Sequence, residues 1–332
     1  MRRKMLLSLL AGLVVVGAAA FGALLYLTRV PGTPHQGDLP PLTADERAIA
    51  ATLKRHIATI AAAEHNIAHY AELEKVAAYL EATLSSLGYT VGRQEFVADG
   101  KTVRNIDVAI EPAGTTDPEV IVVGAHYDSA EDTPGANDNA SGTAAVLELA
   151  RLLRDMRGAR KRIRLVLFVN EEPPYFQTAS MGSLHYARAL KARNERVTAM
   201  LSLETLGYYS DEPGSQKYPP PFGLMFPNKG NFVSFVGLLN SRPLVQETIK
   251  SFRAHTSFPS IGGTAPGIIP GIGWSDHWAF AEYGFQGVMI TDTATFRYPH
   301  YHEPTDTPDK VDTEKLARIV KGVERVVRDL AR

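Results

Sequence analysis

Apolar residues along the chain follow two different spacings that alternate with each other. Recurrence at helical spacing predicts helices over residues 43–63, 68–87, 141–156, 181–192, 232–252 and 313–331. Short continuous apolar runs predict buried strands at 120–124, 163–169, 200–203 and 287–290, with a further strand at 222–226. Two more strands, at 89–97 and 103–110, are expected to form a hairpin around the Asp99-Gly100 turn.

Strands that alternate with helices predict an α/β fold with a mostly parallel central sheet and helices on both faces. The early hairpin adds antiparallel strands at one edge, so the expected sheet is mixed. The sequence has no internal repeat. We therefore expect one domain over residues 42–332.

The N-terminal segment has a different pattern. Basic residues at 2–4 precede an uncharged run at 5–27, which is long enough to cross the ~30 Å hydrocarbon core of a bilayer. This pattern predicts a transmembrane signal-anchor over residues 1–29, with the rest of the chain outside the cytoplasm. A linker at 30–41 follows. Small residues at 17–20 leave open a cleavable signal, which would make the protein secreted.

Composition narrows the chemistry. A formal net charge of −1 gives no reason to expect nucleic acid as a partner. The chain has no cysteine, which excludes disulfides, a thiol nucleophile and thiolate metal ligands. Any metal must therefore be held by nitrogen and oxygen atoms.

Acidic and histidine side chains fall just past the ends of the predicted strands. They are His126, Asp138, Glu171, Glu172, Glu204 and His302. Open α/β sheets bind ligands beyond the carboxyl ends of their strands, so we expect these side chains to gather at one edge. The set is large enough to hold two divalent metals and to leave one carboxylate as a base.

Local chemistry suggests individual roles. In an extended backbone His126 and Asp128 project to the same side, and a histidine ligand typically donates its second N–H to a carboxylate. Asp138 can bridge two metals through its two oxygens, although a helix-capping role competes. Adjacent acids after a buried strand are costly unless paired or metal-bound, so we assign Glu171 as general base and Glu172 as ligand. Three histidines stay open for the remaining ligand position: His277, His300 and His302.

Six segments carry these residues in order along the chain: VVGAHYDS, PGANDNASG, FVNEE, LSLETLG, SDHWAF and YHEPTDTPD. Their content and order resemble metallopeptidase family 28, the co-catalytic dizinc exopeptidases, from about Ala68 to the C-terminus. The resemblance implies a zinc-exopeptidase fold, two Zn²⁺ and a peptide substrate. The implied ligands are His126 and Glu204 for one zinc, Glu172 and His302 for the other, and Asp138 between them.

The resemblance also implies that Glu171 takes a proton from a water between the metals. Asp276 and His277 would support the site without binding metal. Glu204 stands where many family members carry aspartate. The region 173–180 is longer than usual, and together with 208–222 it is expected to shape the substrate pocket.

The predicted function is a zinc-dependent exopeptidase, specifically an aminopeptidase. A carboxypeptidase or dipeptidase on the same core is the first alternative. A glutaminyl-cyclase-like acyltransferase with one zinc and a non-catalytic ectodomain are the others. Retention of all five ligand positions and of the base argues against the ectodomain.

Overall fold

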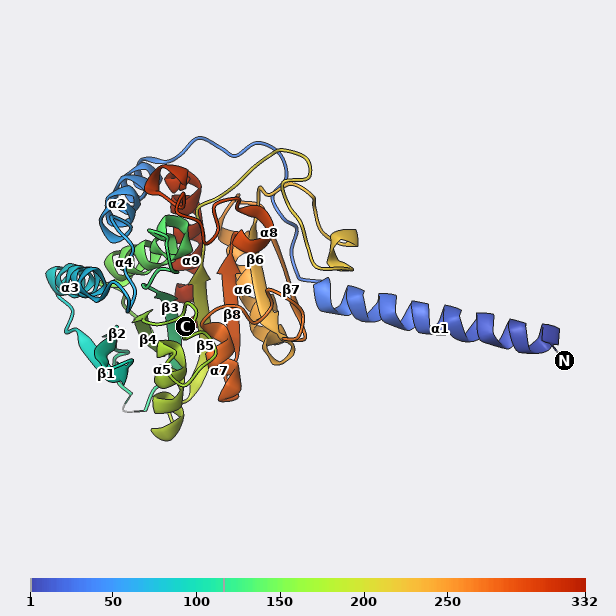
Figure 1. Cartoon of the computed structure of the whole chain (residues 1–332), viewed down its shortest axis with the longest axis horizontal. Helices are drawn as coiled ribbons and strands as arrows, with labels where there is room; N and C mark the ends of the chain where they lie inside the picture. Colours follow the sequence, from blue (N-terminus) through green and yellow to red (C-terminus); the bar gives the residue numbers. More distant parts are fainter. Residues whose placement is uncertain (1, 116) are drawn as a thin grey trace.

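The computed structural model describes residues 2–115 and 117–332. Over these residues the chain forms one eight-stranded mixed sheet with the strand order β1-β2-β4-β3-β5-β8-β6-β7 (Figure 1). The strands are β1 (Gly92–Ala98), β2 (Lys101–Ile110), β3 (Val120–His126), β4 (Arg162–Phe168), β5 (Val197–Glu204), β6 (Val233–Leu238), β7 (Ser260–Ala265) and β8 (Gly287–Thr291). The expected mixed α/β sheet is confirmed, with the β1–β2 hairpin at one edge.

Helices cover both faces of the sheet, as predicted. The helices are α1 (Arg2–Thr28), α2 (Ala44–Ile60), α3 (Tyr70–Ser86), α4 (Ser141–Leu153), α5 (Gly182–Ala192), α6 (Arg242–His255), α7 (His277–Glu282), α8 (Ala294–Arg297) and α9 (Thr313–Leu330). Helices α2, α4, α6 and α9 pack together on one face, while α5 and α7 pack together on the other. On the second face Phe280 meets Phe168 edge to face, at 6.1 Å between ring centroids.

The region around residues 222–252 differs from the prediction. Residues 222–226 were expected to form a strand, but Phe222–Leu224 is a short 3₁₀ helix. The strand is β6, which lies inside the predicted helix 232–252. Helix α6 begins only at Arg242, followed by Pro243 in its first turn, where proline is tolerated. The apolar residues of β6 and those of α6 together follow a helical spacing, so the sequence predicted one helix where the structure has a strand and a helix.

Strand β7 was not predicted, because its sequence has no apolar run. Its two glycines instead permit close packing. A Cβ at Gly262 would lie 2.9 Å from the carbonyl oxygen of Phe235 in β6, with which β7 pairs in parallel.

The sheet brings the strand ends together at one edge. His126 ends β3, and its Cα pairs with Phe168 at the end of β4. Glu204 ends β5 and pairs with Thr291 at the end of β8. The four central strands β4, β3, β5 and β8 therefore deliver their following residues to one place.

Helix α1 projects from the side of the domain on which β6 and β7 lie (Figure 1). Within its segment Lys4–Thr28, the most apolar stretch of 18 residues has a mean hydropathy of 2.3 and is unburied. Among the described residues it is the one helix long and apolar enough to cross a membrane. Residues 29–43 contain no helix or strand and connect α1 to α2.

Candidate metal centre

Asp138 lies at the centre of the gathered side chains. Its Oδ1 is 3.3 Å from Nε2 of His126, and its Oδ2 is 3.1 Å from Nε2 of His302. The two oxygens of one carboxylate thus face two different histidines.

Each histidine also faces a second acid. Nε2 of His126 is 3.5 Å from Oε2 of Glu204, and Nε2 of His302 is 3.2 Å from Oε2 of Glu172. The structure therefore gives two groups of ligand atoms, each with one imidazole and one glutamate, which share Asp138. The ligand atoms of His126, Asp138 and Glu172 all lie within 4.8 Å of one another.

Several of these atoms lack a hydrogen-bond partner. Nε2 of His126, Nε2 of His302 and Oε1 of Glu172 are buried and unpartnered. Leaving such groups unsatisfied is costly, and an ion is a recognised explanation. Nitrogen and carboxylate oxygen are ligands that zinc accepts. The residues present therefore fit bound zinc.

Glu171 lies at the edge of the His126 group. Its Oε2 is 3.9 Å from Nε2 of His126, and the residue is 7% exposed. Burial raises the pKa of the Glu171 carboxyl well above its usual value; His126 opposes this shift and Glu204 adds to it. A carboxylate at this position can accept a proton beside the ligand atoms.

Asp128 is buried, but its contacts differ from the predicted pairing. Its backbone carbonyl lies 3.1 Å from Nδ1 of His126, closer than its carboxylate at 3.6 Å. The carboxylate instead accepts the backbone N–H groups of Glu171 and Glu172, each at 3.1 Å. Asp128 thus positions both acids that follow β4, and the histidine as well.

The three candidate histidines occupy different places. His300 bonds Thr305 through Nδ1 at 2.7 Å. His277 is buried and contacts the carbonyl oxygen of Ile272 at 2.8 Å, and burial lowers its pKa to about 4. His302 is the one that the structure brings to Asp138. Asp276 is fully buried, and burial raises its pKa to about 7.

Supporting residues were missed from the sequence. Asp306 accepts the backbone N–H groups of Asn137 and Asp138, at 2.8 and 3.0 Å, and the hydroxyl of Tyr298 at 2.6 Å. The hydroxyl of Ser275 donates to Oε2 of Glu204 at 2.7 Å. These contacts join segments far apart in sequence, so no local pattern could have identified them.

Protons compete with a metal ion for the ligand side chains of this site. Burial opposes charge on His302, but Asp138 and Glu172 outweigh burial and raise its pKa to about 10. Burial, together with Asp138, raises the pKa of Glu172 to about 7. Metal ligands must be deprotonated, so binding has to displace these protons.

Zinc affinity is therefore expected to rise from about pH 6 to about pH 8, because Glu172 loses its proton across this range and the proton that zinc displaces from His302 competes less strongly as the pH rises. Calorimetric titration of the metal-free protein in buffers of different ionisation enthalpy measures the protons released. A binding enthalpy independent of the buffer would contradict this account.

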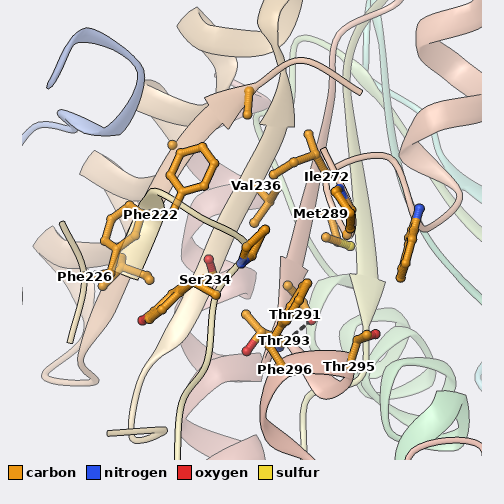
Figure 2. Close-up of a pocket in the computed structure, with 18 of the residues that line it drawn as sticks. Phe222, Phe226, Ser234, Val236, Ile272, Met289, Thr291, Thr293, Thr295 and Phe296 are labelled. Atoms are coloured by element: carbon orange, nitrogen blue, oxygen red, sulfur yellow. Dashed lines mark hydrogen bonds between the residues drawn. The ribbon is translucent and has the colours of Figure 1, made fainter. Parts of the chain in front are cut away.

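An apolar cavity of about 860 Å³, open solvent included, adjoins the metal centre at Glu204. Figure 2 shows it lined by Val236 of β6, Met289 of β8, and Phe222 and Phe226 from the loop before β6. Residues 216–222 contribute to the lining as expected, whereas residues 173–180 do not.

A buried arginine holds the loop before β6. Arg297 donates from Nε to Oε1 of Gln216 at 2.8 Å and from Nη1 to the carbonyl oxygen of Phe232 at 2.9 Å. The cavity wall is therefore anchored to α8.

Comparison with known proteins defines the family. A model of Peptidase family M28 matches residues 105–327. The chain belongs to this family, and the metallopeptidase family predicted from the sequence is confirmed.

Two relatives illustrate the similarity. YfbL of Escherichia coli is 37% identical over 260 residues, covering 76% of this chain and 78% of YfbL. Aminopeptidase YwaD of Bacillus subtilis is 30% identical over 71% of this chain and 44% of its own length. The chain spans about half the length of YwaD and of other curated relatives that it matches.

The fold is shared with a zinc aminopeptidase from Bacillus subtilis, BSAP, at a TM-score of 0.70 and 18% identity. The match covers 88% of this chain and 97% of BSAP. Glutaminyl cyclases share this fold too, so the fold does not separate the two activities. The activity must be argued from the site.

Proposed function

We propose that the protein is a dizinc aminopeptidase that hydrolyses the N-terminal residue from peptides. One observation carries the proposal: the two oxygens of Asp138 face His126 on one side and His302 on the other. Glu204 and Glu172 complete the two ligand groups. A one-zinc acyltransferase would need only one of these groups.

Two zinc ions in this site would supply a nucleophile at neutral pH and polarise the scissile carbonyl. Glu171 would accept the proton released from the attacking water and pass it to the leaving amine. Asp128 would keep Glu171 and Glu172 in place through their backbone N–H groups. His126 and His302 act as neutral ligands once their protons have left.

The charge around the cavity favours an aminopeptidase over a carboxypeptidase. Among the described residues that line it, Glu204 is the one charged side chain. A carboxypeptidase needs a cation for the terminal carboxylate of its substrate, and the described lining residues include no lysine or arginine. The apolar lining fits an apolar or aromatic side chain at the N-terminus of the substrate.

The test compares four substrates with the zinc-loaded full-length protein: a leucyl peptide with a free N-terminus, its N-acetylated form, its C-terminal amide, and a peptide that begins with glutamine. We expect the first and third to be cleaved at the N-terminal residue and the acetylated peptide to resist. Cleavage of the acetylated peptide at its C-terminus would refute the aminopeptidase assignment, and cyclisation of an N-terminal glutamine would favour the acyltransferase.

Tyr301 is a further proposed participant. It lines the cavity with Glu204, and its ring stacks on His302 at 4.0 Å between centroids. Burial and the nearby carboxylates, Asp138 first among them, raise the pKa of its hydroxyl well above the usual value. The hydroxyl therefore stays protonated and can donate to the oxyanion that forms on the substrate.

Tyr301→Phe is expected to lower kcat by about 10²–10³-fold, the usual effect of losing one such donor, while zinc content stays unchanged. Tyr218→Phe is the matched control, because Tyr218 also lines the cavity but donates to the carbonyl oxygen of Pro227. Steady-state kinetics and metal analysis of both variants decide the matter. Equal kcat values for the two variants would remove Tyr301 from the mechanism.

We also propose that residues 1–29 anchor the protein in a membrane, that 30–41 connect the anchor, and that 42–332 form the peptidase domain outside the cytoplasm. The length, apolarity and exposure of α1 support this assignment. Cleavage of the segment would release a secreted form.

A further inference from the structure

The C-terminal end of α1 forms part of the surface of the peptidase domain. Thr28 is buried. It lines the apolar cavity together with Phe222 and Trp274. Gly263 of β7 permits this contact, since a Cβ there would lie 2.9 Å from the carbonyl oxygen of Leu27. Helix and strand therefore meet backbone to backbone at the cavity.

Two arginines of α6 hold the chain on either side of this contact. Arg242 donates to the carbonyl oxygen of Tyr26 at 2.8 Å, and its guanidinium lies 3.9 Å from the centre of the Tyr26 ring. Arg253 donates to the carbonyl oxygens of Pro31 and Gly32, at 2.8 Å each. Helix α1 thus leaves the domain at a fixed place and without a free spacer.

The exposed part of α1 ends very near the domain. Tyr26 is 61% exposed, and one residue separates it from Thr28. At about 1.5 Å of rise per residue, this separation is about 3 Å. The polar layer on each side of the hydrocarbon core is itself about 5–7 Å thick. When α1 crosses a bilayer, the cavity wall at Thr28 consequently lies at the level of the lipid headgroups.

Large apolar side chains project into solvent around the same cavity. Leu224 is 84% exposed, Ile268 is 91% exposed and Trp274 is 42% exposed. Trp274 lines the cavity. Leu224 lies two positions after the lining residue Phe222, and Ile268 lies two positions before the lining residue Pro270. In Figure 1 the gold segment near residue 222 lies beside the point where α1 leaves the domain. Clustered exposed apolar groups mark interaction sites, and tryptophan favours the membrane interface.

We propose that Leu224, Ile268 and Trp274, the apolar rim of the cavity, rest in the interface of the bilayer that α1 crosses. This inference builds on the proposed anchor. The bilayer is the fitting occupant because the rim adjoins the end of the membrane span and α1 is docked against the same cavity. The substrate cavity then opens at the membrane surface, so a peptide enters it from along the membrane.

The absence of cysteine makes a direct test possible. Full-length Ile268→Cys and Leu224→Cys are labelled with an environment-sensitive dye and reconstituted in phosphatidylcholine vesicles that contain a spin-labelled lipid quencher. Val97→Cys is the matched control, because Val97 is 69% exposed on β1 at the opposite edge of the sheet. Vesicle flotation is measured on the same samples.

We expect the protein to float with the vesicles. The dyes at 268 and 224 should shift to shorter emission wavelength and lose most of their fluorescence to the quencher, while the dye at 97 should do neither. Flotation without quenching at 268 and 224 would overturn the membrane contact and leave the anchor intact. A wavelength shift without quenching would mean that protein, such as a second copy, covers the rim, and would also overturn it. Failure to float would refute the anchor and this inference together.

Discussion

Replacing Glu171 with glutamine is expected to lower kcat by about 10²–10⁴-fold, the range that one general base contributes. Glutamine has the same size but cannot accept the proton. The Glu171 carboxylate lies 3.9 Å from Nε2 of His126. Among the described residues, this is its one ion-pair contact with a predicted zinc ligand. Both zinc ions should therefore stay bound in Glu171→Gln.

The neighbouring acid gives the matched comparison. Glu172→Gln removes a predicted ligand 3.2 Å from His302, so this variant should lose zinc as well as activity. Metal content per chain and peptide hydrolysis are measured for both variants. Wild-type activity in Glu171→Gln, or loss of zinc from it, would contradict the assigned division of roles.

Asp138→Asn is expected to weaken both zinc ions and to abolish hydrolysis. Residues that only orient a ligand typically contribute 10–100-fold to metal affinity, so loss of a shared ligand should exceed about 100-fold. The amide would offer one oxygen where Asp138 offers one to each histidine. Competition with a chelator of known affinity measures both sites.

Asp132→Asn is the control for this substitution. Asp132 belongs to the same loop but is exposed, so its amide variant should bind two zinc ions with unchanged affinity. Loss of only one zinc in Asp138→Asn would mean that the aspartate serves a single ion.

The sequence predicted the central strands and the family because both depend on local patterns. Buried parallel strands read as short apolar runs, and the runs of β3, β4 and β5 each lead to a residue of the site. The edge beyond β8 was predicted poorly for a physical reason. Strand β7 relies on Gly262 and Gly263 for close approach to its neighbours, and glycine leaves no apolar signal.

Within the site, the sequence could identify acids and histidines but not their partners. The placement of Asp138 depends on Asp306, which lies 168 residues later. Asp128 lies beside His126 as expected, but the sequence did not indicate that its carboxylate also binds the backbone after β4. Such contacts arise from the assembled sheet edge, and His302 could be chosen over His277 and His300 only by resemblance.

The most direct test of the dizinc account is recovery of hydrolysis as zinc is added back to the metal-free full-length protein. The account predicts that two zinc ions bind per chain and that activity reaches its plateau only when both are bound. Full activity with one zinc ion, or a chain that binds no zinc, would contradict it.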